Sequence, residues 1–193
     1  VKKYAGEIIV VDGHSKDNTK EIVAKLQVKY LLDNGIGRGD GVRMGISSAK
    51  NEVVVLVDAD GSHEISDIPH LIKPIIENRA DLVIASRRTG GSNDMEMNFN
   101  GLIRSAGSDL LVMLTNNRFN TKFTDILYSL RAVNKNKFLK AKLTSNGFGI
   151  EQEMVVNFLQ KKYKKTKKNF YKIIKKTPRS TLKLKILTYT TLT

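Results

Sequence analysis

The stretch EVVVLVDADGSHEISD, Glu52–Asp67, carries the clearest structural signal in the chain. Its first part, Val53–Val57, is a continuous apolar run in which four of five residues are valine, and such a run is typical of a parallel strand buried on both faces. Asp58 and Asp60 follow with a single residue between them. Residues i and i+2 of an extended segment point to the same side. Because ligands of open α/β sheets bind at the carboxyl ends of strands, we expect both carboxylates to face a ligand there.

Two carboxylates with room for further ligands suit a hard divalent cation that also holds a diphosphate. We therefore predict that Asp58 and Asp60 bind Mg²⁺ or Mn²⁺. Whether Ser62 or His63 contacts the same metal stays open from the sequence. For His63, a loop histidine with no metal role is an equally good interpretation.

The segments on either side of this stretch alternate between short apolar runs and helical patterns. We expect strands over 7–11, 28–32 and 81–85, and helices that begin within 12–19, at 42 and at 68. This alternation indicates a mainly parallel sheet flanked by crossover helices. Glycines occupy every second position of Gly35–Gly41, just before a helix, so backbone N–H groups can approach a phosphate there while Arg38 adds charge. Asp67 is expected to cap the helix that begins at Ile68.

The second half of the chain has a weaker pattern. We expect a helix over 102–114, a strand over Asp125–Val133, a short basic helix over 135–143 and a helix that runs through Phe158.

Composition limits the classes of protein. A chain of 193 residues suits one domain, and the absence of cysteine excludes disulfides and thiolate metal sites. We expect neither a membrane-spanning helix nor a signal peptide. The net charge of +14 indicates an anionic partner.

Much of this charge lies near the end of the chain. Lys161–Lys176 holds nine lysines in sixteen residues. We divide the chain into a domain over 1–160 and a basic C-terminal tail over 161–193. Lysines attract a protein to an anionic membrane surface, which predicts a cytoplasmic protein associated peripherally with a membrane. A solvated tail without a partner is the alternative.

The order of the motifs resembles glycosyltransferase family 2, which has the Rossmann-like GT-A fold, and within it the dolichyl- or polyprenyl-phosphate sugar synthases. The resemblance covers about 7–159 and rests on the segments EIIVVDGHSKDNT, GRGDGVRMGI, DADGSHEISDIP, DLVIASR, DILYSLRAV and GFGIEQEM. The family opens with an earlier strand. The resemblance therefore implies that the strands at Glu7 and Glu52 lack the neighbour that they share in the family.

The resemblance also implies a reaction and its residues. An inverting transfer would move mannose or glucose from GDP-mannose or UDP-glucose to a dolichyl or polyprenyl phosphate. The DxD motif, Asp58 and Asp60, would hold the metal. Donor binding would fall to Asp12, Arg38 and Asp58. The catalytic residues would be Asp58, Asp60 and Asp125, and the acceptor phosphate would be bound by Arg87, Arg104 and Arg131.

Two other functions stay open from the sequence. The charge also fits a basic domain that binds nucleic acid or another anion, and the chain could be a truncated, inactive family member. We expect no nucleic acid as partner, because the basic excess lies in the tail and no nucleic-acid motif is present.

Overall fold

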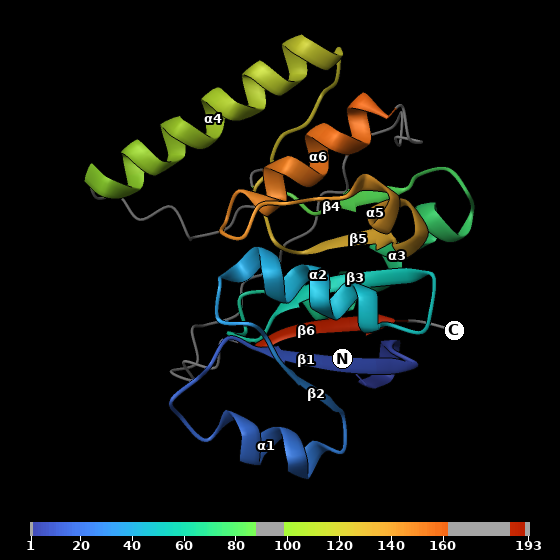
Figure 1. Cartoon of the computed structure of the whole chain (residues 1–193). Helices are drawn as coiled ribbons and strands as arrows, with labels where there is room; N and C mark the ends of the chain where they lie inside the picture. The colour runs from blue at the N-terminus through green and yellow to red at the C-terminus, as the bar shows by residue number, and fades with distance from the viewer. Residues whose placement is uncertain (1, 88–98, 162–185, 192–193) are drawn as a thin grey trace.

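A computed structural model of the chain describes the backbone of residues 2–87, 99–161 and 186–191, and the side chains of residues 2–87 and 105–161. Within these residues, six strands form one sheet in the order β2-β1-β6-β3-β5-β4 (Figure 1). The strands are β1 (Glu7–Asp12), β2 (Lys29–Leu32), β3 (Val53–Asp58), β4 (Leu82–Ile84), β5 (Arg131–Asn134) and β6 (Ile186–Thr191).

The strand directions confirm the predicted α/β fold and add a feature to it. β1 and β3 both run antiparallel to β6, and β3 and β4 both run antiparallel to β5. β1 and β2 pair in parallel. The strands predicted before residue 86 therefore share one direction, as expected. β5 and β6 lie between them in the opposite direction, so β1 and β2 are the one pair of described strands that is hydrogen-bonded in parallel.

β6 is the strand that the sequence did not predict. It lies between β1 and β3 and pairs antiparallel with both along its length, as Figure 1 shows. The expectation that β1 and β3 lack a shared neighbour is therefore wrong. The inner edges of β1 and β3 would otherwise leave backbone N–H and C=O groups without partners. A segment assigned to the tail thus forms part of the sheet, whereas residues 162–185, with most of the lysine cluster, lie outside the described residues.

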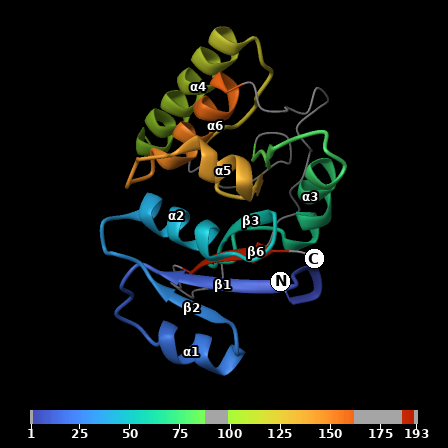
Figure 2. The same ribbon diagram turned by 45° about the vertical axis from the view of Figure 1, so that its right-hand side comes forward.

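Helices flank the sheet on both faces. Figures 1 and 2 show α4 at the periphery, with α6 between it and the sheet. Among the residues that the structure describes, no helix has both the length and the apolar character that a membrane span requires. The helices are α1 (Thr19–Leu26), α2 (Arg38–Ser48), α3 (Ile68–Ile76), α4 (Phe99–Phe119), α5 (Lys135–Ala141) and α6 (Ile150–Gln160).

The core forms on both faces of β3, as its valine run predicts. Val54 and Leu56 pack with side chains of α2, α5 and α6. Val55 and Val57 pack on the other face with side chains of α3 and β4. This double burial fixes the end of β3, and therefore Asp58, in a rigid setting.

Two local predictions are wrong. The strand expected over Asp125–Val133 begins only at Arg131, because the Asp125 carboxylate accepts hydrogen bonds from the backbone N–H groups of Leu127 and Tyr128 and folds the chain into a turn. Asp67 makes no capping hydrogen bond to α3. Its Oδ2 atom is instead buried with no hydrogen-bond partner among the described residues.

Candidate functional site

The candidate site lies where β3 ends and α2 begins. Asp58 is the last residue of β3 and Arg38 is the first residue of α2. Arg38 Nη2 donates to Asp58 Oδ1 at 3.0 Å, and Arg38 Nε donates to Glu151 Oε1 at 2.6 Å. Burial lowers the pKa of Arg38, but the two carboxylates outweigh burial and leave this pKa above its ordinary value. Arg38 therefore stays charged and joins β3 to α6.

The glycines around Arg38 allow two chain segments to pack closely. Gly37 has a φ of 119°, a conformation that other residues rarely adopt. At Gly39, an added Cβ would lie 1.9 Å from the carbonyl oxygen of Ser145. The N–H group of Gly39 donates to Asn146 O at 2.6 Å, so it has a protein partner. The glycine run thus serves first to bring the segment before α6, and with it Glu151, against α2; a phosphate contact by this run stays a prediction.

Asp58 has further partners on its other side. Ser129 Oγ donates to Asp58 Oδ2 at 2.6 Å. The backbone N–H of Asp58 donates to His63 Nδ1 at 3.0 Å, and His63 Nε2 lies 3.1 Å from Ser129 Oγ. Burial lowers the pKa of His63, so the ring is neutral at pH 7. The Asp58 side chain is still 27% exposed, which leaves it open to a ligand.

Asp60 lies in an exposed turn beyond the strand. Its Oδ1 atom accepts hydrogen bonds from the backbone N–H and the hydroxyl of Ser62, at 2.9 and 2.5 Å. Partial burial raises the pKa of Asp60, but these hydrogen bonds outweigh it, and the pKa lies below its ordinary value. Asp60 is therefore ionised at neutral pH, as a metal ligand must be.

The residues present fit a hard cation only in part. Asp58 and Asp60 supply oxygen donors of the kind that Mg²⁺ and Mn²⁺ prefer. Within the described ranges, no group of three or more His, Cys, Asp or Glu side chains is placed to hold a metal. The remaining ligands would have to come from water and substrate, which is the usual arrangement for Mg²⁺.

Asp12 ends β1 at the same edge of the sheet. The side chain is buried and accepts hydrogen bonds from the N–H of Ser15 at 2.9 Å and the hydroxyl of Tyr30 at 2.6 Å. Burial raises the pKa of Asp12, but these bonds outweigh it and leave the pKa below its ordinary value. Donor contact by this carboxylate stays a prediction.

Arg87 and Asp125 form an ion pair on the other side of the site. Arg87 Nε donates to Asp125 Oδ2 at 2.8 Å, and the guanidinium lies over the Tyr128 ring at 5.2 Å. Asp125 is buried, whereas the Arg87 side chain is 39% exposed. Arg87 is thus held in place yet open to an anion, while Asp125 orients Arg87 and the turn that follows it.

Arg131 occupies a different environment from the one predicted. Its side chain is completely buried, and it donates to the carbonyl oxygens of Ile126, Tyr128 and Glu151. Burial lowers the pKa of Arg131 to about 10, so it is charged at pH 7. A guanidinium without exposed surface is not open to an acceptor phosphate in this conformation, which corrects that assignment. The side chain of Arg104, also predicted to bind the phosphate, lies outside the described residues.

The sequence prediction missed two residues that contact the site. Glu151 pairs with Arg38, and its Oε2 atom is buried without a hydrogen-bond partner among the described residues. Ser129 contacts Asp58 from a segment 71 residues away. An acidic residue after the glycine-rich GFG segment was a visible signal for Glu151, whereas nothing in the pattern distinguished Ser129.

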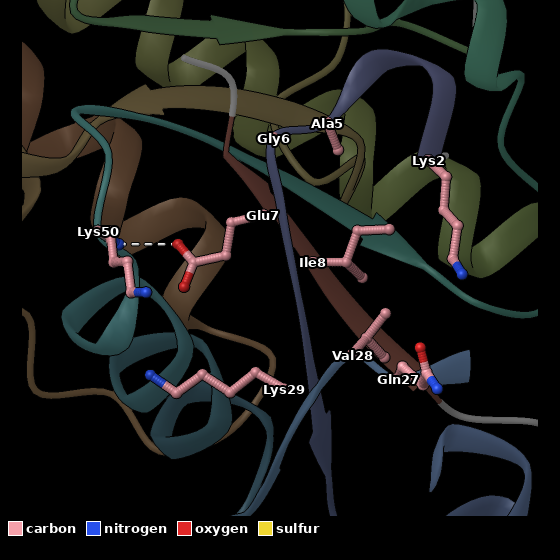
Figure 3. Close-up of a pocket in the computed structure, with 9 residues that line it drawn as sticks. All are labelled: Lys2, Ala5, Gly6, Glu7, Ile8, Gln27, Val28, Lys29 and Lys50. Atoms are coloured by element: carbon pink, nitrogen blue, oxygen red, sulfur yellow. Dashed lines mark hydrogen bonds between the residues drawn. The ribbon is translucent and has the colours of Figure 1, made fainter. Parts of the chain in front are cut away.

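A separate hollow lies at the opposite end of β1 (Figure 3). Lys2 Nζ donates to Leu26 O and Lys29 Nζ donates to Ser48 O, each at 3.0 Å. These carbonyls belong to the last residues of α1 and α2, where cations satisfy C-terminal carbonyl groups. Lys2 and Lys29 therefore have a structural task, and the residues that line this hollow include none of the predicted site residues.

Known proteins are similar to this chain in sequence. Residues 2–171 match the sequence model of Glycosyl transferase family 2. Glycosyltransferase AglJ of Haloferax volcanii is 29% identical over 163 residues, which is 82% of this chain and 51% of that protein. Dolichyl-phosphate beta-glucosyltransferase ALG5D of Trichomonas vaginalis is 33% identical over 95 residues, 45% of this chain and 29% of that protein.

Solved structures show the same fold. Glucosyl-3-phosphoglycerate synthase of Mycobacterium tuberculosis, in complex with phosphoglyceric acid, superposes with a TM-score of 0.62 and 18% identity over 81% of this chain and 55% of that chain. The same enzyme with Mn²⁺, uridine diphosphate and glucosyl-3-phosphoglycerate gives a TM-score of 0.55 at 15% identity, over 81% of this chain and 55% of that one. The chain thus spans about half the length of AglJ and of this synthase. Since the family model matches most of the sequence, the chain belongs to glycosyl transferase family 2.

Proposed function

We propose that the chain forms the catalytic region of an inverting glycosyltransferase. It would transfer mannose or glucose from GDP-mannose or UDP-glucose to a dolichyl or polyprenyl phosphate. The observation that carries the proposal is the partly exposed Asp58 carboxylate at the end of β3, beside Arg38 and followed by Asp60, in a chain of family 2.

The donor binds on the side of β1, β3 and α2. Asp58 and Asp60 hold Mg²⁺ or Mn²⁺, which when bound neutralises negative charge on the departing diphosphate. Arg38 is the cation that pairs with Asp58 and Glu151, and its fork of N–H groups suits a diphosphate. Asp12, at the end of β1, contacts the nucleoside.

The acceptor binds on the side of Arg87. A phosphate oxygen of the acceptor attacks the anomeric carbon, and the bond from that carbon to the donor diphosphate breaks with its electron pair leaving on the diphosphate. Because the acceptor is already an anion, no strong general base is required. Arg87 orients the acceptor phosphate, and such positioning is a large part of catalysis for a reaction of this kind. Asp125 acts through Arg87 rather than on the substrate.

The nature of the acceptor is the finer part of the proposal. A dolichyl phosphate is supported by the Trichomonas vaginalis relative, whose name states that acceptor. The Mycobacterium tuberculosis synthase, similar in fold, is instead named for a phosphoglycerate product. Both acceptors present a phosphate, so Arg87 suits either, and the assay has to separate them.

The test is a donor and acceptor panel. GDP-mannose and UDP-glucose are each offered with short-chain polyprenyl phosphate or with 3-phosphoglycerate, in Mn²⁺, Mg²⁺ or EDTA. We expect transfer to the polyprenyl phosphate that needs a divalent cation. Asp60→Asn should reduce turnover at least ~100-fold, through loss of charge stabilisation at the diphosphate.

Glu77→Gln is the matched control, because Glu77 is an exposed carboxylate on the far end of α3. Its turnover should equal that of the unmodified chain. Full activity in EDTA, or equal activity of Asp60→Asn and Glu77→Gln, would exclude the metal-dependent mechanism. Transfer to 3-phosphoglycerate but not to polyprenyl phosphate would contradict the lipid acceptor and indicate a soluble phosphate acceptor instead.

We also propose peripheral contact with an anionic membrane, where a polyprenyl phosphate resides. The support is Lys161–Lys176, since each lysine near an anionic surface contributes about 1 kcal/mol. Co-sedimentation with vesicles should increase with anionic lipid and decrease with salt. Binding that responds to neither would contradict this electrostatic attachment.

A further inference from the structure

Beside Asp58 lie two polar side chains from separate parts of the chain, Ser129 and His63. We propose that these are positioning residues, which hold the backbone and the carboxylate of Asp58 in the orientation needed to bind the metal and the donor diphosphate. This inference rests on the proposed function and adds two residues to its machinery.

The direction of each hydrogen bond follows from the neighbours of His63. The backbone N–H of Asp58 points at His63 Nδ1, so Nδ1 is the acceptor. A neutral imidazole with an acceptor at Nδ1 carries its proton on Nε2. Nε2–H therefore donates to Ser129 Oγ, and the Ser129 hydroxyl donates to Asp58 Oδ2. The three hydrogen bonds thus have consistent directions, and the last one ends on the Asp58 carboxylate.

This series of hydrogen bonds holds Asp58 at two points. His63 holds its backbone N–H, and Ser129 holds one carboxylate oxygen, while Arg38 pairs with the other oxygen. Arg38 is also the cation that a donor diphosphate attracts most directly. If Arg38 turns to the diphosphate, Ser129 and His63 keep the Asp58 carboxylate in place.

The two supporting side chains are themselves rigid. His63 is buried and meets the Tyr128 ring edge-on, with ring centroids 5.0 Å apart. Ser129 directly follows residues 126–128, whose backbone groups form hydrogen bonds with the side chains of Asp125 and Arg131. Buried Asp125 and Arg131 thus contribute to the site by fixing the position of Ser129, which explains why two charged residues are buried there.

The first experiment measures Mn²⁺ affinity in the presence of UDP, by titration with electron paramagnetic resonance. Ser129→Ala should weaken Mn²⁺ binding at least about tenfold, as loss of a hydrogen-bond partner of a metal ligand commonly does. Ser129→Thr keeps the hydroxyl and should recover most of this affinity. Thr124→Val is the matched control, because Thr124 donates to Ser86 at 2.8 Å from the same segment without contacting Asp58.

The second experiment reads the tautomer of His63 by ¹⁵N NMR of the metal-free protein, with His63→Gln to assign the signal. We expect the proton on Nε2 in the unmodified chain. A proton on Nδ1, or equal Mn²⁺ affinity in Ser129→Ala and Thr124→Val, would overturn the proposal. Failure of the unmodified chain to bind Mn²⁺ and UDP would instead count against the proposed function, so the two failures are distinguishable.

Discussion

Charged groups lie at both ends of the sheet but make different contacts. At the carboxyl ends of β1 and β3, charged side chains contact one another across long sequence separations, as in the pair of Arg38 and Glu151. At the opposite end, Lys2 and Lys29 bind carbonyl groups at the ends of nearby helices. The first end is therefore where the fold places Arg38 between the partly exposed carboxylate of Asp58 and the buried carboxylate of Glu151.

β6 pairs with both β1 and β3 over nearly its whole length. Its removal should therefore have the largest effect on the stability of the fold. Deleting residues 186–193 would expose the inner backbone edges of both strands, and we expect loss of most of the roughly 5–15 kcal/mol that stabilises a typical domain. Circular dichroism melting and hydrogen exchange of β1 and β3 amides would measure this. A truncation after Thr191 is the control. Unchanged exchange in β1 and β3 would show that β6 does not hold them together.

Arg131 lies beside the carboxyl end of β3, and a substitution tests whether this buried arginine serves stability or substrate binding. Arg131→Met leaves buried carbonyl oxygens without donors and should cost about 3 kcal/mol or more in the free energy of unfolding. Arg118→Met, at an exposed position of α4, should be nearly neutral. Denaturant melts compare the two variants. An Arg131→Met protein with full stability but a raised KM for the acceptor would restore the phosphate-binding assignment.

Arg87 is the exposed counterpart of Arg131. Arg87→Met should raise the KM for the phosphate acceptor about tenfold, equivalent to ~1.4 kcal/mol. The free energy of unfolding should also fall, because the buried Asp125 carboxylate loses its counter-ion. Steady-state kinetics at varied acceptor concentration measures the effect. An unchanged acceptor KM, with a raised KM for the nucleotide-sugar, would move Arg87 to the donor side.

Asp67 gives a smaller, pH-dependent effect. Burial and the nearby Glu64 raise its pKa from the ordinary 3.8 to about 6. The folded state therefore holds this proton more tightly than the unfolded state, and the contribution of Asp67 to stability falls as pH rises from about 4 to 6. Asp67→Asn should be more stable than the unmodified chain by about 1–2 kcal/mol at pH 7, with no gain below pH 4. Melts across this range test it; a gain that is independent of pH would exclude the titration of Asp67 as its cause.

Lys29 should show the smallest effect. Lys29→Gln loses one exposed contact to a helix C-terminus and should cost less than ~0.5 kcal/mol, with unchanged transfer activity. Melting and the transfer assay together check this. A large loss of activity would mean that the amino end of the sheet also takes part in function.

Local patterns in the sequence determined much of the fold. The valine run predicted β3 with both faces buried, and the alternation of strands and helices up to residue 86 predicted β1, β2 and β4 with one direction. The Asp58–Asp60 pair at the end of β3 was also visible, because strand and motif lie in one continuous stretch. These features depend on residues that are close together in the sequence, so their local pattern is sufficient to predict them.

Only the tertiary structure decided which distant groups meet. Ser129 and Glu151 reach Asp58 and Arg38 from segments 71 and 113 residues away, and no local pattern encodes such contacts. Arg87 and Arg131 look alike in the sequence, yet one is partly exposed beside Asp125 and the other is completely buried among carbonyl groups. The place of β6 between β1 and β3 is likewise a long-range pairing, since register and neighbour are set by the available sheet edges rather than by the strand's own residues.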